Sequence, residues 1–250
     1  MNFSQSVFRM LGLTLRLLAW LMGKGYGSAT IGKEVKAVSS QLTQNPQLAI
    51  DVGGNVGGYS KALRSKMPNL EIHIFEPSSL NVAKLRAAFE GDHMVHINPV
   101  GLSDGNGEAV LYSDTPGGGL GSLANRRLDH FGIEMNPMEN VTIICFEDYW
   151  KNTLASRTID IAKLDVEGFE LAVLRGFGEA IYSTRVVQFE FGGCNLDTRT
   201  NFQDFYYFFT KLNFMLYRIT PIGLNEIKKY SELDEIYLTT NFLAVNTKLN

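Results

Sequence analysis

Apolar segments with two different spacings alternate along most of the chain. Between the strand-like runs, apolar residues recur at helical spacing, as Val82, Leu85 and Phe89 do after a potential cap at Ser78 and Ser79. Short apolar runs bounded by turn residues are typical of buried strands, and they occupy residues 48–52, 71–77, 94–104, 159–165 and 186–191. Because strands and helices alternate, the pattern predicts an α/β fold on a mostly parallel, doubly wound sheet.

Two parts of the chain depart from this alternation. Residues 107–150 contain the strand-like runs "EAVLY" and "VTIICF" around a glycine-rich loop, and no clear strand–helix unit. The last two strand-like runs, 214–219 and 241–246, are joined by a segment that resembles a hairpin more than a helical crossover. We therefore expect two added strands in the first region and an antiparallel last strand.

The N-terminal residues 3–22 form an apolar helix with a narrow polar stripe. The stripe consists of Gln5, Arg9, Gly12 and Arg16, at positions i, i+4, i+7 and i+11. Its uninterrupted apolar core is too short to span a membrane. Three alternatives remain for its apolar surface: packing on the domain, a homodimer, or peripheral contact with a membrane. The expected organisation is a helix and linker over residues 1–40, followed by one α/β domain over 41–250.

The charge and the cysteine content limit which partners the protein can bind and in which compartment it is expected. The net charge of −3 gives no overall basic field, so we expect no nucleic-acid partner. The two cysteines, Cys145 and Cys194, lie in no CxxC pair, which excludes a zinc ribbon and a thioredoxin motif. Such sparse cysteines favour reduced thiols and a cytoplasmic protein, with peripheral membrane contact as the alternative.

A glycine-dense turn, "DVGGNVGGYS", follows the first strand-like run. In a parallel sheet, ligands bind beyond the carboxyl ends of the strands, where this turn lies. A dinucleotide fingerprint needs a second glycine where Asn55 stands, and the Asp51 carboxylate would repel a pyrophosphate. Gly53, Gly54 and Gly57 allow close approach of the backbone to a ligand. Together these residues favour S-adenosylmethionine, which carries an ammonium and a sulfonium but no phosphate.

The next two strand ends carry further candidates for a nucleoside site. Glu76 ends the second strand-like run, where a carboxylate can accept hydrogen bonds from both ribose hydroxyls. NAD shares that feature, so Glu76 supports a nucleoside without selecting the cofactor. Ser103 and Asp104 follow the third run and can flank an adenine, although Asp104 could equally be a turn residue before Gly105.

Carboxylates at the ends of the fourth and fifth runs are the catalytic candidates. Asp165 and Glu167 follow the fourth strand, and Glu190 could face them from the fifth. Converging carboxylates could remove a proton from a hydroxyl group or hold a divalent metal ion. We predict no metal site, and we interpret Glu170 as a helix-dipole partner.

Four motifs in order and spacing give the chain a resemblance to a known family. "DVGGNVGGYS", "IFEP", "GLSD" and "KLDVEGFE" resemble the motifs of FkbM-type methyltransferases, over about residues 49–246. The resemblance implies a Rossmann-like class I methyltransferase fold, S-adenosylmethionine as cofactor, and O-methylation of a sugar or another small hydroxylated acceptor. One departure is Gly54, where the family more often has alanine, and the N-terminal helix lies outside the motifs.

The resemblance also implies roles for the candidate residues. Glu76 would hold the ribose, and Ser103 with Asp104 would lie at the adenine. The methionine part would be surrounded by Asp51, Gly53, Asn55 and Gly57.

Two other functions remain as alternatives. The first is an NAD-dependent oxidoreductase on a Rossmann fold, which Asp51 and the missing second glycine disfavour. The second is a non-catalytic cofactor-binding protein, which the intact set of site residues disfavours.

Overall fold

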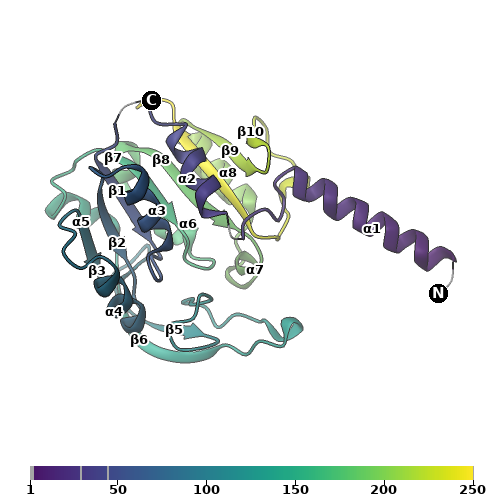
Figure 1. The fold of residues 1–250 in the computed structure, drawn as a ribbon, viewed down its shortest axis with the longest axis horizontal. Helices are drawn as coiled ribbons and strands as arrows, with labels where there is room; N and C mark the ends of the chain where they lie inside the picture. The colour runs from purple at the N-terminus through teal and green to yellow at the C-terminus, as the bar shows by residue number, and fades with distance from the viewer. Residues whose placement is uncertain (1–2, 29, 44, 250) are drawn as a thin grey trace.

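The computed structural model describes residues 3–28, 30–43 and 45–249 (Figure 1). The strands are β1 (Leu48–Val52), β2 (Glu71–Phe75), β3 (Val95–Asn98), β4 (Gly101–Leu102), β5 (Gly107–Ser113), β6 (Asn136–Ile144), β7 (Ile159–Leu164), β8 (Thr184–Phe191), β9 (Phe214–Thr220), β10 (Gly223–Glu226) and β11 (Thr240–Asn246). The α-helices are α1 (Phe3–Leu21), α2 (Ile31–Ser39), α3 (Gly58–Lys66), α4 (Ser79–Ala88), α5 (Phe146–Asn152), α6 (Glu170–Gly176), α7 (Cys194–Thr198) and α8 (Phe202–Lys211). Short 3-10 helices occupy Asp129–Phe131, Gly178–Ser183 and Glu232–Asp234.

The large sheet has eight strands in the order β10-β9-β11-β8-β7-β1-β2-β3. Strands β3, β2, β1, β7 and β8 pair in parallel, whereas β11 pairs antiparallel with both β8 and β9. This confirms the predicted doubly wound sheet with an antiparallel last strand. The connection between β9 and β11 contains β10, an additional strand that the sequence pattern did not indicate.

Helices cover both faces of the sheet. This is required because the apolar side chains of β1 point alternately to the two faces and all are buried. Leu48, Ile50 and Val52 pack into the cluster that contains residues of α5, α6 and α8. Ala49 belongs to the opposite cluster, with residues of α2, α3 and α4. Because successive side chains in a strand alternate, Asp51 shares the face of Ala49 and lies under α3.

Helix α2 forms part of the packed body, although its sequence lies within the predicted N-terminal extension. Val35 and Val38 are buried against the sheet. Glu34 of α2 accepts a hydrogen bond from Gln188 of β8 at 2.6 Å. The packed body therefore includes residues before 41.

A second, three-stranded sheet with the order β4-β6-β5 stands apart from the large one, below it in Figure 1. Strands β5 and β6 pair antiparallel, which confirms the two added strands. The predicted run 94–104 is split, because β3 ends at Asn98 and Gly101–Leu102 pairs with β6. Pro99 lies at the break; it has no N–H group to continue the ladder.

Helix α1 confirms the predicted N-terminal helix but does not pack on the domain. It projects from the body, and no other element lies along it (Figure 1). No helix in the described part of the chain is both long enough and apolar enough to cross a membrane.

Candidate functional site

The turn after β1 is shaped by its glycines. The N–H groups of Gly53 and Gly54 donate to the carbonyl of Phe75, at 2.9 and 3.2 Å. Gly53 has a φ of +79°, and a Cβ there would collide with the carbonyl oxygen of Asp165. Asn55 also has a positive φ, of 46°. Only glycine allows the turn to pass this close to the end of β7.

We expect Gly53→Ala to destabilise the protein strongly. The substitution combines a left-handed φ with a backbone collision, so the free energy of unfolding should fall by about 2 kcal/mol or more. Urea denaturation measures this change. Gly105→Ala is the matched control, because a Cβ at Gly105 meets nothing within 4 Å; an equal loss in both variants would contradict the role of the turn.

Glu76 lies at the end of β2 and is held by two backbone donors. Its Oε2 accepts from the N–H of Asn55 at 2.8 Å, and its Oε1 accepts from the N–H of Ser78 at 2.9 Å. The side chain is buried, and burial raises the pKa of Glu76 despite these two hydrogen bonds. A carboxylate offers about four acceptor positions, so about two remain for a ligand.

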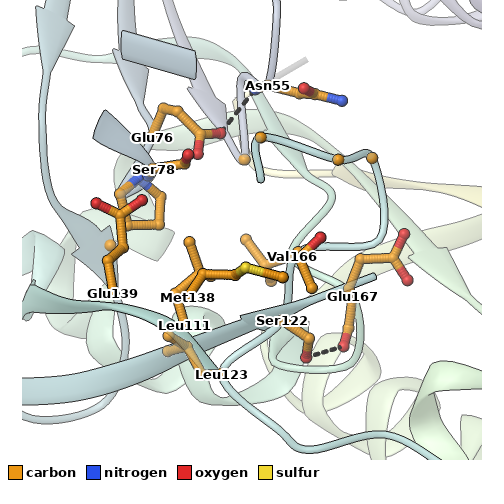
Figure 2. A pocket seen from close by; sticks show the side chains of 18 of the residues that line it. Asn55, Glu76, Ser78, Leu111, Ser122, Leu123, Met138, Glu139, Val166 and Glu167 are labelled. Atoms are coloured by element: carbon orange, nitrogen blue, oxygen red, sulfur yellow. Dashed lines mark hydrogen bonds between the residues drawn. The ribbon is translucent and has the colours of Figure 1, made fainter. Parts of the chain in front are cut away.

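A cavity of about 240 Å³ opens between this turn and the small sheet. Glu76 and Glu139 lie on one side of it and Glu167 on the other (Figure 2). Its apolar walls come from both sheets, from the glycine-rich loop between β5 and β6 and from the β7–α6 loop. They include Phe75, Leu102, Leu111, Leu123, Met138, Val166 and Phe169. The residues from β5 and β6 were not predicted, because the sequence does not reveal how the added sheet packs.

Several predicted cofactor residues lie behind the wall of this cavity. Gly53 and Asn55 line it, whereas Asp51, Gly54 and Gly57 do not. A Cβ at Gly54 would collide with Ile74, and one at Gly57 would lie 2.7 Å from the ring of Phe89. These two glycines therefore allow close packing beneath the turn.

Asp51 is almost fully buried beneath α3. Its Oδ2 accepts a hydrogen bond from Ser60 at 2.6 Å, while Oδ1 has no hydrogen-bond partner among the residues that the structure describes. Burial raises the pKa of Asp51, although the nearby Lys163 ammonium opposes this shift. The predicted contact of Asp51 with a cofactor stays a prediction.

Ser103 and Asp104 follow β4 and lie beyond the cavity lining. Gly101 and Leu102 form the wall at this position. The backbone of Ser103 instead approaches α6 so closely that a Cβ on Gly176 would collide with its carbonyl oxygen. Their predicted contact with an adenine therefore also stays a prediction.

The loop between β7 and α6 brings the catalytic candidates together. Asp165 and Glu167 line both the first cavity and a second one of about 460 Å³, which Glu190 also lines. Lys163 donates to Asp165 at 2.8 Å. Burial disfavours the Lys163 ammonium, but Asp165 and Asp51 raise its pKa above the ordinary value. Sequence reasoning missed Lys163, although it precedes Asp165 by two residues and shares its strand face.

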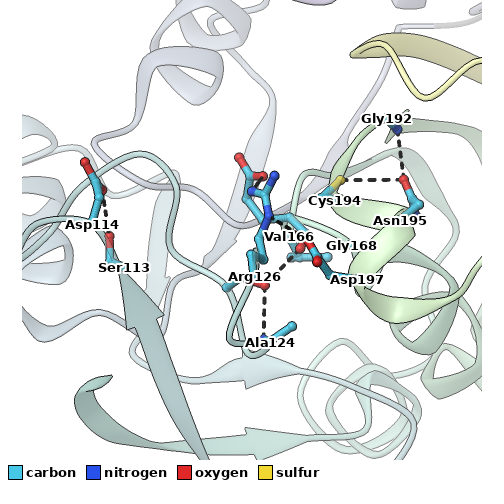
Figure 3. Close-up of polar contacts among 12 residues, drawn as sticks. Ser113, Asp114, Ala124, Arg126, Val166, Gly168, Gly192, Cys194, Asn195 and Asp197 are labelled. Carbon is cyan, nitrogen blue, oxygen red and sulfur yellow. Dashed lines mark hydrogen bonds and ion pairs between the residues drawn. The ribbon is translucent and has the colours of Figure 1, made fainter. Parts of the chain in front are cut away.

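Glu167 combines a buried carboxyl group with an arginine partner. Burial and the charge of Asp165 raise the pKa of Glu167 to about 7, against the attraction of Arg126. Arg126 comes from the glycine-rich loop and donates to Glu167. Its Nε atom also lies 3.5 Å from Oδ2 of Asp197 (Figure 3). The loop is held in place a second time by Ser122, which donates to the carbonyl of Glu167 at 2.9 Å (Figure 2).

The other acidic groups nearby differ in their surroundings. Burial, followed by the charges of Asp165 and Glu167, raises the pKa of Glu190 well above the ordinary value. Glu170 lies in the first turn of α6 and accepts from the N–H groups of Val166 and Gly168. It lines neither cavity, which agrees with a structural role.

Replacing Glu170 with glutamine should stabilise the protein above neutral pH. Burial raises the pKa of Glu170 to about 7 from its ordinary value of 4.5, so the folded chain binds more protons than the unfolded chain between these pH values. Its contribution to stability is therefore present below pH 4.5 and is lost as pH rises through about 7. We expect Glu170→Gln to gain about 1–3 kcal/mol at pH 8 and nothing at pH 4.5 in urea denaturation. Glu90→Gln, at an exposed position, is the control, and a pH-independent difference would contradict this reasoning.

One cluster outside the two cavities could hold a metal ion. Glu71, His73 and His96 place ligand atoms within 4.8 Å of one another. However, both ring nitrogens of His73 already have partners, Tyr149 at 2.7 Å and Glu71 at 2.9 Å, and Arg157 pairs with Glu71. These hydrogen bonds indicate that the cluster has a structural role. It lies at the start of β2, at the opposite end of the strand from Glu76.

Comparison with known proteins points to one family. The model of the methyltransferase FkbM domain matches residues 51–217, which is more than half of the chain. No curated protein matches the chain. A solved methyltransferase FkbM from Methylobacillus flagellatus KT is 13% identical, with a TM-score of 0.51 over 82% of this chain and 45% of that one. The chain thus shares its fold and spans less than half of its length.

Two further solved structures are similar at lower scores. A putative O-methyltransferase from Klebsiella pneumoniae is 10% identical, with a TM-score of 0.49 over 88% of this chain and 81% of that one. The plantazolicin methyltransferase BpumL, solved in complex with SAH, is 10% identical, with a TM-score of 0.46 over 86% and 83%.

Proposed function

The chain belongs to the FkbM methyltransferase family, and we propose that it transfers a methyl group from S-adenosylmethionine to a hydroxyl group of a sugar or another small acceptor. The observation that carries this proposal is the position of one loop. Asp165 and Glu167 line both cavities, so a donor in the first and an acceptor in the second would meet at these carboxylates.

The first cavity fits the chemical groups of the proposed cofactor. Glu76 has acceptor positions left for the two ribose hydroxyls, and the apolar walls suit an adenine ring. The Oδ1 of Asp51 has no hydrogen-bond donor among the described residues and lies behind the wall of this cavity, so the ammonium of the methionine part would reach it through a water molecule. Asp165 lines the same cavity, so its carboxylate would attract the positively charged sulfonium of the cofactor.

The chemistry that S-adenosylmethionine supplies is an electrophilic methyl group on sulfur. The protein must align the acceptor oxygen with that methyl group and remove the hydroxyl proton. Glu167 is the base in this proposal, because a carboxyl group with a pKa of about 7 is half ionised at neutral pH. Glu167 would take up the hydroxyl proton of the acceptor, and the bound cofactor would supply the methyl group and leave as S-adenosylhomocysteine.

The neighbouring residues would orient the base and the acceptor. Arg126 holds Glu167 against the loop, and Lys163 holds Asp165. Burial and the like charges of Asp165 and Glu167 raise the pKa of Glu190 well above its ordinary value, and Glu190 lines the second cavity, where it can contact an acceptor. The buried Cys194 is not suited to nucleophilic chemistry, because burial raises the pKa of its thiol.

A labelled-methyl experiment tests the proposed reaction. Methyl-labelled S-adenosylmethionine is incubated with the full chain and with glycan and small-hydroxyl extracts, and the products are hydrolysed in alkali. We expect label in alkali-stable methyl ethers. Label recovered only in amines or in alkali-labile esters would contradict O-methylation while leaving methyl transfer intact.

A further inference from the structure

Helix α1 presents an unusually large apolar surface to solvent. Nine large apolar side chains between Phe8 and Leu21 are each at least 40% exposed. The helix projects from the body with no other element beside it (Figure 1). A patch of this size on a soluble domain marks an interaction surface.

The distribution of these side chains around the helix favours a planar partner. At about 100° per residue, the large apolar side chains cover about two thirds of the circumference. Both arginines of the helix lie on a narrow stripe with Gln5 and Gly12, and the polar residues within the apolar arc are the small hydroxyl residues Ser4, Ser6 and Thr14. A second helix would bury a seam of roughly 100°, which leaves much of this surface in water. A bilayer surface can accept the whole apolar face, with the two arginines at the level of the lipid headgroups.

The charge of the N-terminal segment indicates which kind of bilayer it would bind. The first 33 residues contain Arg9, Arg16, Lys24 and Lys33 but no aspartate or glutamate, whereas the whole chain has a net charge of −3. Such a segment is attracted to anionic lipids.

The residues that follow α1 are hydrogen-bonded to the body near the second cavity. Lys24 donates to the carbonyl of Leu233, and the N–H of Gly25 donates to Thr240 at 3.0 Å. Gly27 and Ser28, which follow Lys24 and Gly25 in the sequence, line the second cavity. Phe131, which is 70% exposed, lines the same cavity from the glycine-rich loop. A surface that holds α1 therefore also lies close to the proposed acceptor site.

We propose that α1 docks the protein on an anionic lipid bilayer, lying along its surface, and that the acceptor is a membrane-attached hydroxylated amphiphile. The first part stands on α1 alone. The second part rests on the proposed function, because it assigns the second cavity to the acceptor.

Sedimentation of the full chain with lipid vesicles tests the docking. We expect binding to phosphatidylcholine vesicles that contain phosphatidylglycerol, weaker binding to phosphatidylcholine alone, and a decrease with added salt. Leu11→Gln combined with Leu18→Gln should weaken binding at least about tenfold, because both leucines lie within the apolar face. Tyr182→Gln, which removes an apolar side chain 61% exposed on the body, should bind like the unchanged chain.

Two outcomes would overturn the docking. The first is an unchanged chain that sediments with neither kind of vesicle. The second is a dimer in analytical ultracentrifugation that the double leucine variant dissociates, without vesicle binding, since α1 would then pair two copies.

The acceptor class is tested with labelled S-adenosylmethionine and a cell extract separated into lipid and water-soluble fractions. Label in the lipid fraction, reduced by the double leucine variant, supports a membrane-attached acceptor, and label only in the water-soluble fraction overturns it. Label in neither fraction would count against methyl transfer itself. The vesicle experiment needs no cofactor, so failure of the docking and failure of the proposed function are distinguishable.

Discussion

Replacing Glu76 with alanine should weaken the binding of S-adenosylhomocysteine by about 100-fold. Two hydrogen bonds from ribose hydroxyls to a buried carboxylate contribute about 1.5–3 kcal/mol each, so their loss corresponds to a factor of this order or more. The variant also removes the acceptor for the N–H groups of Asn55 and Ser78, which loosens the turn that lines the cavity. Isothermal titration calorimetry measures the change in affinity.

Two controls separate ribose binding from loss of the fold. Glu90→Gln changes an exposed glutamate outside both cavities and should leave the affinity unchanged. Glu76→Gln keeps one carbonyl acceptor and should bind with an intermediate affinity. If Glu76→Ala unfolds at the same urea concentration as the unchanged chain and still binds with the same affinity, the ribose site has been placed wrongly.

Replacing Glu167 with glutamine should lower kcat by about 10²–10³-fold and change the affinity for S-adenosylhomocysteine by less than about threefold. General bases contribute factors of this size to proton transfer. Burial raises the pKa of Glu167 to about 7, so the basic form is absent below that pH and present above it. The kcat of the unchanged chain should therefore rise through about pH 7, and this rise should disappear in the variant.

Glu170→Gln is the matched control for this experiment. Burial raises the pKa of Glu170 to about 7 as well, but its carboxylate binds backbone N–H groups and lines neither cavity. We expect it to keep both kcat and the pH profile. A Glu167→Gln variant with full turnover, or a pH profile that follows Glu170 instead, would exclude Glu167 as the base.

The parts of the site that lie at strand ends could be predicted from the sequence. The turn at Gly53 and Asn55, Glu76 and the pair Asp165–Glu167 all lie where a parallel sheet gathers its carboxyl ends. Each of these positions follows from the order of the apolar runs, because residues that follow parallel strands all lie at the same edge of the sheet.

Features that depend on long-range packing could not be predicted. The cavity walls from Leu111 and Met138 depend on how the added sheet folds over the large one. Pro99 lies where the third predicted strand ends early, and Gly101–Leu102, which precede Ser103 and Asp104, pair with the added sheet instead. Strand alternation places Asp51 on the face of β1 that lies under α3, which the apolar pattern alone does not show, and its contact with a cofactor stays a prediction.

Helix α2 was overlooked for a different reason. Its sequence follows a glycine-rich segment and is short, so it was interpreted as part of a linker. Tertiary contacts from Val35 and Val38, rather than local propensity, stabilise it.

The central claim is that the first cavity binds an adenosine-containing methyl donor, and titration of S-adenosylhomocysteine into the unchanged full chain tests it most directly. We predict saturable binding of one molecule per chain in calorimetry, with no saturable binding when NADH is titrated instead. Absence of heat at millimolar S-adenosylhomocysteine, or saturation by NADH, would contradict the claim.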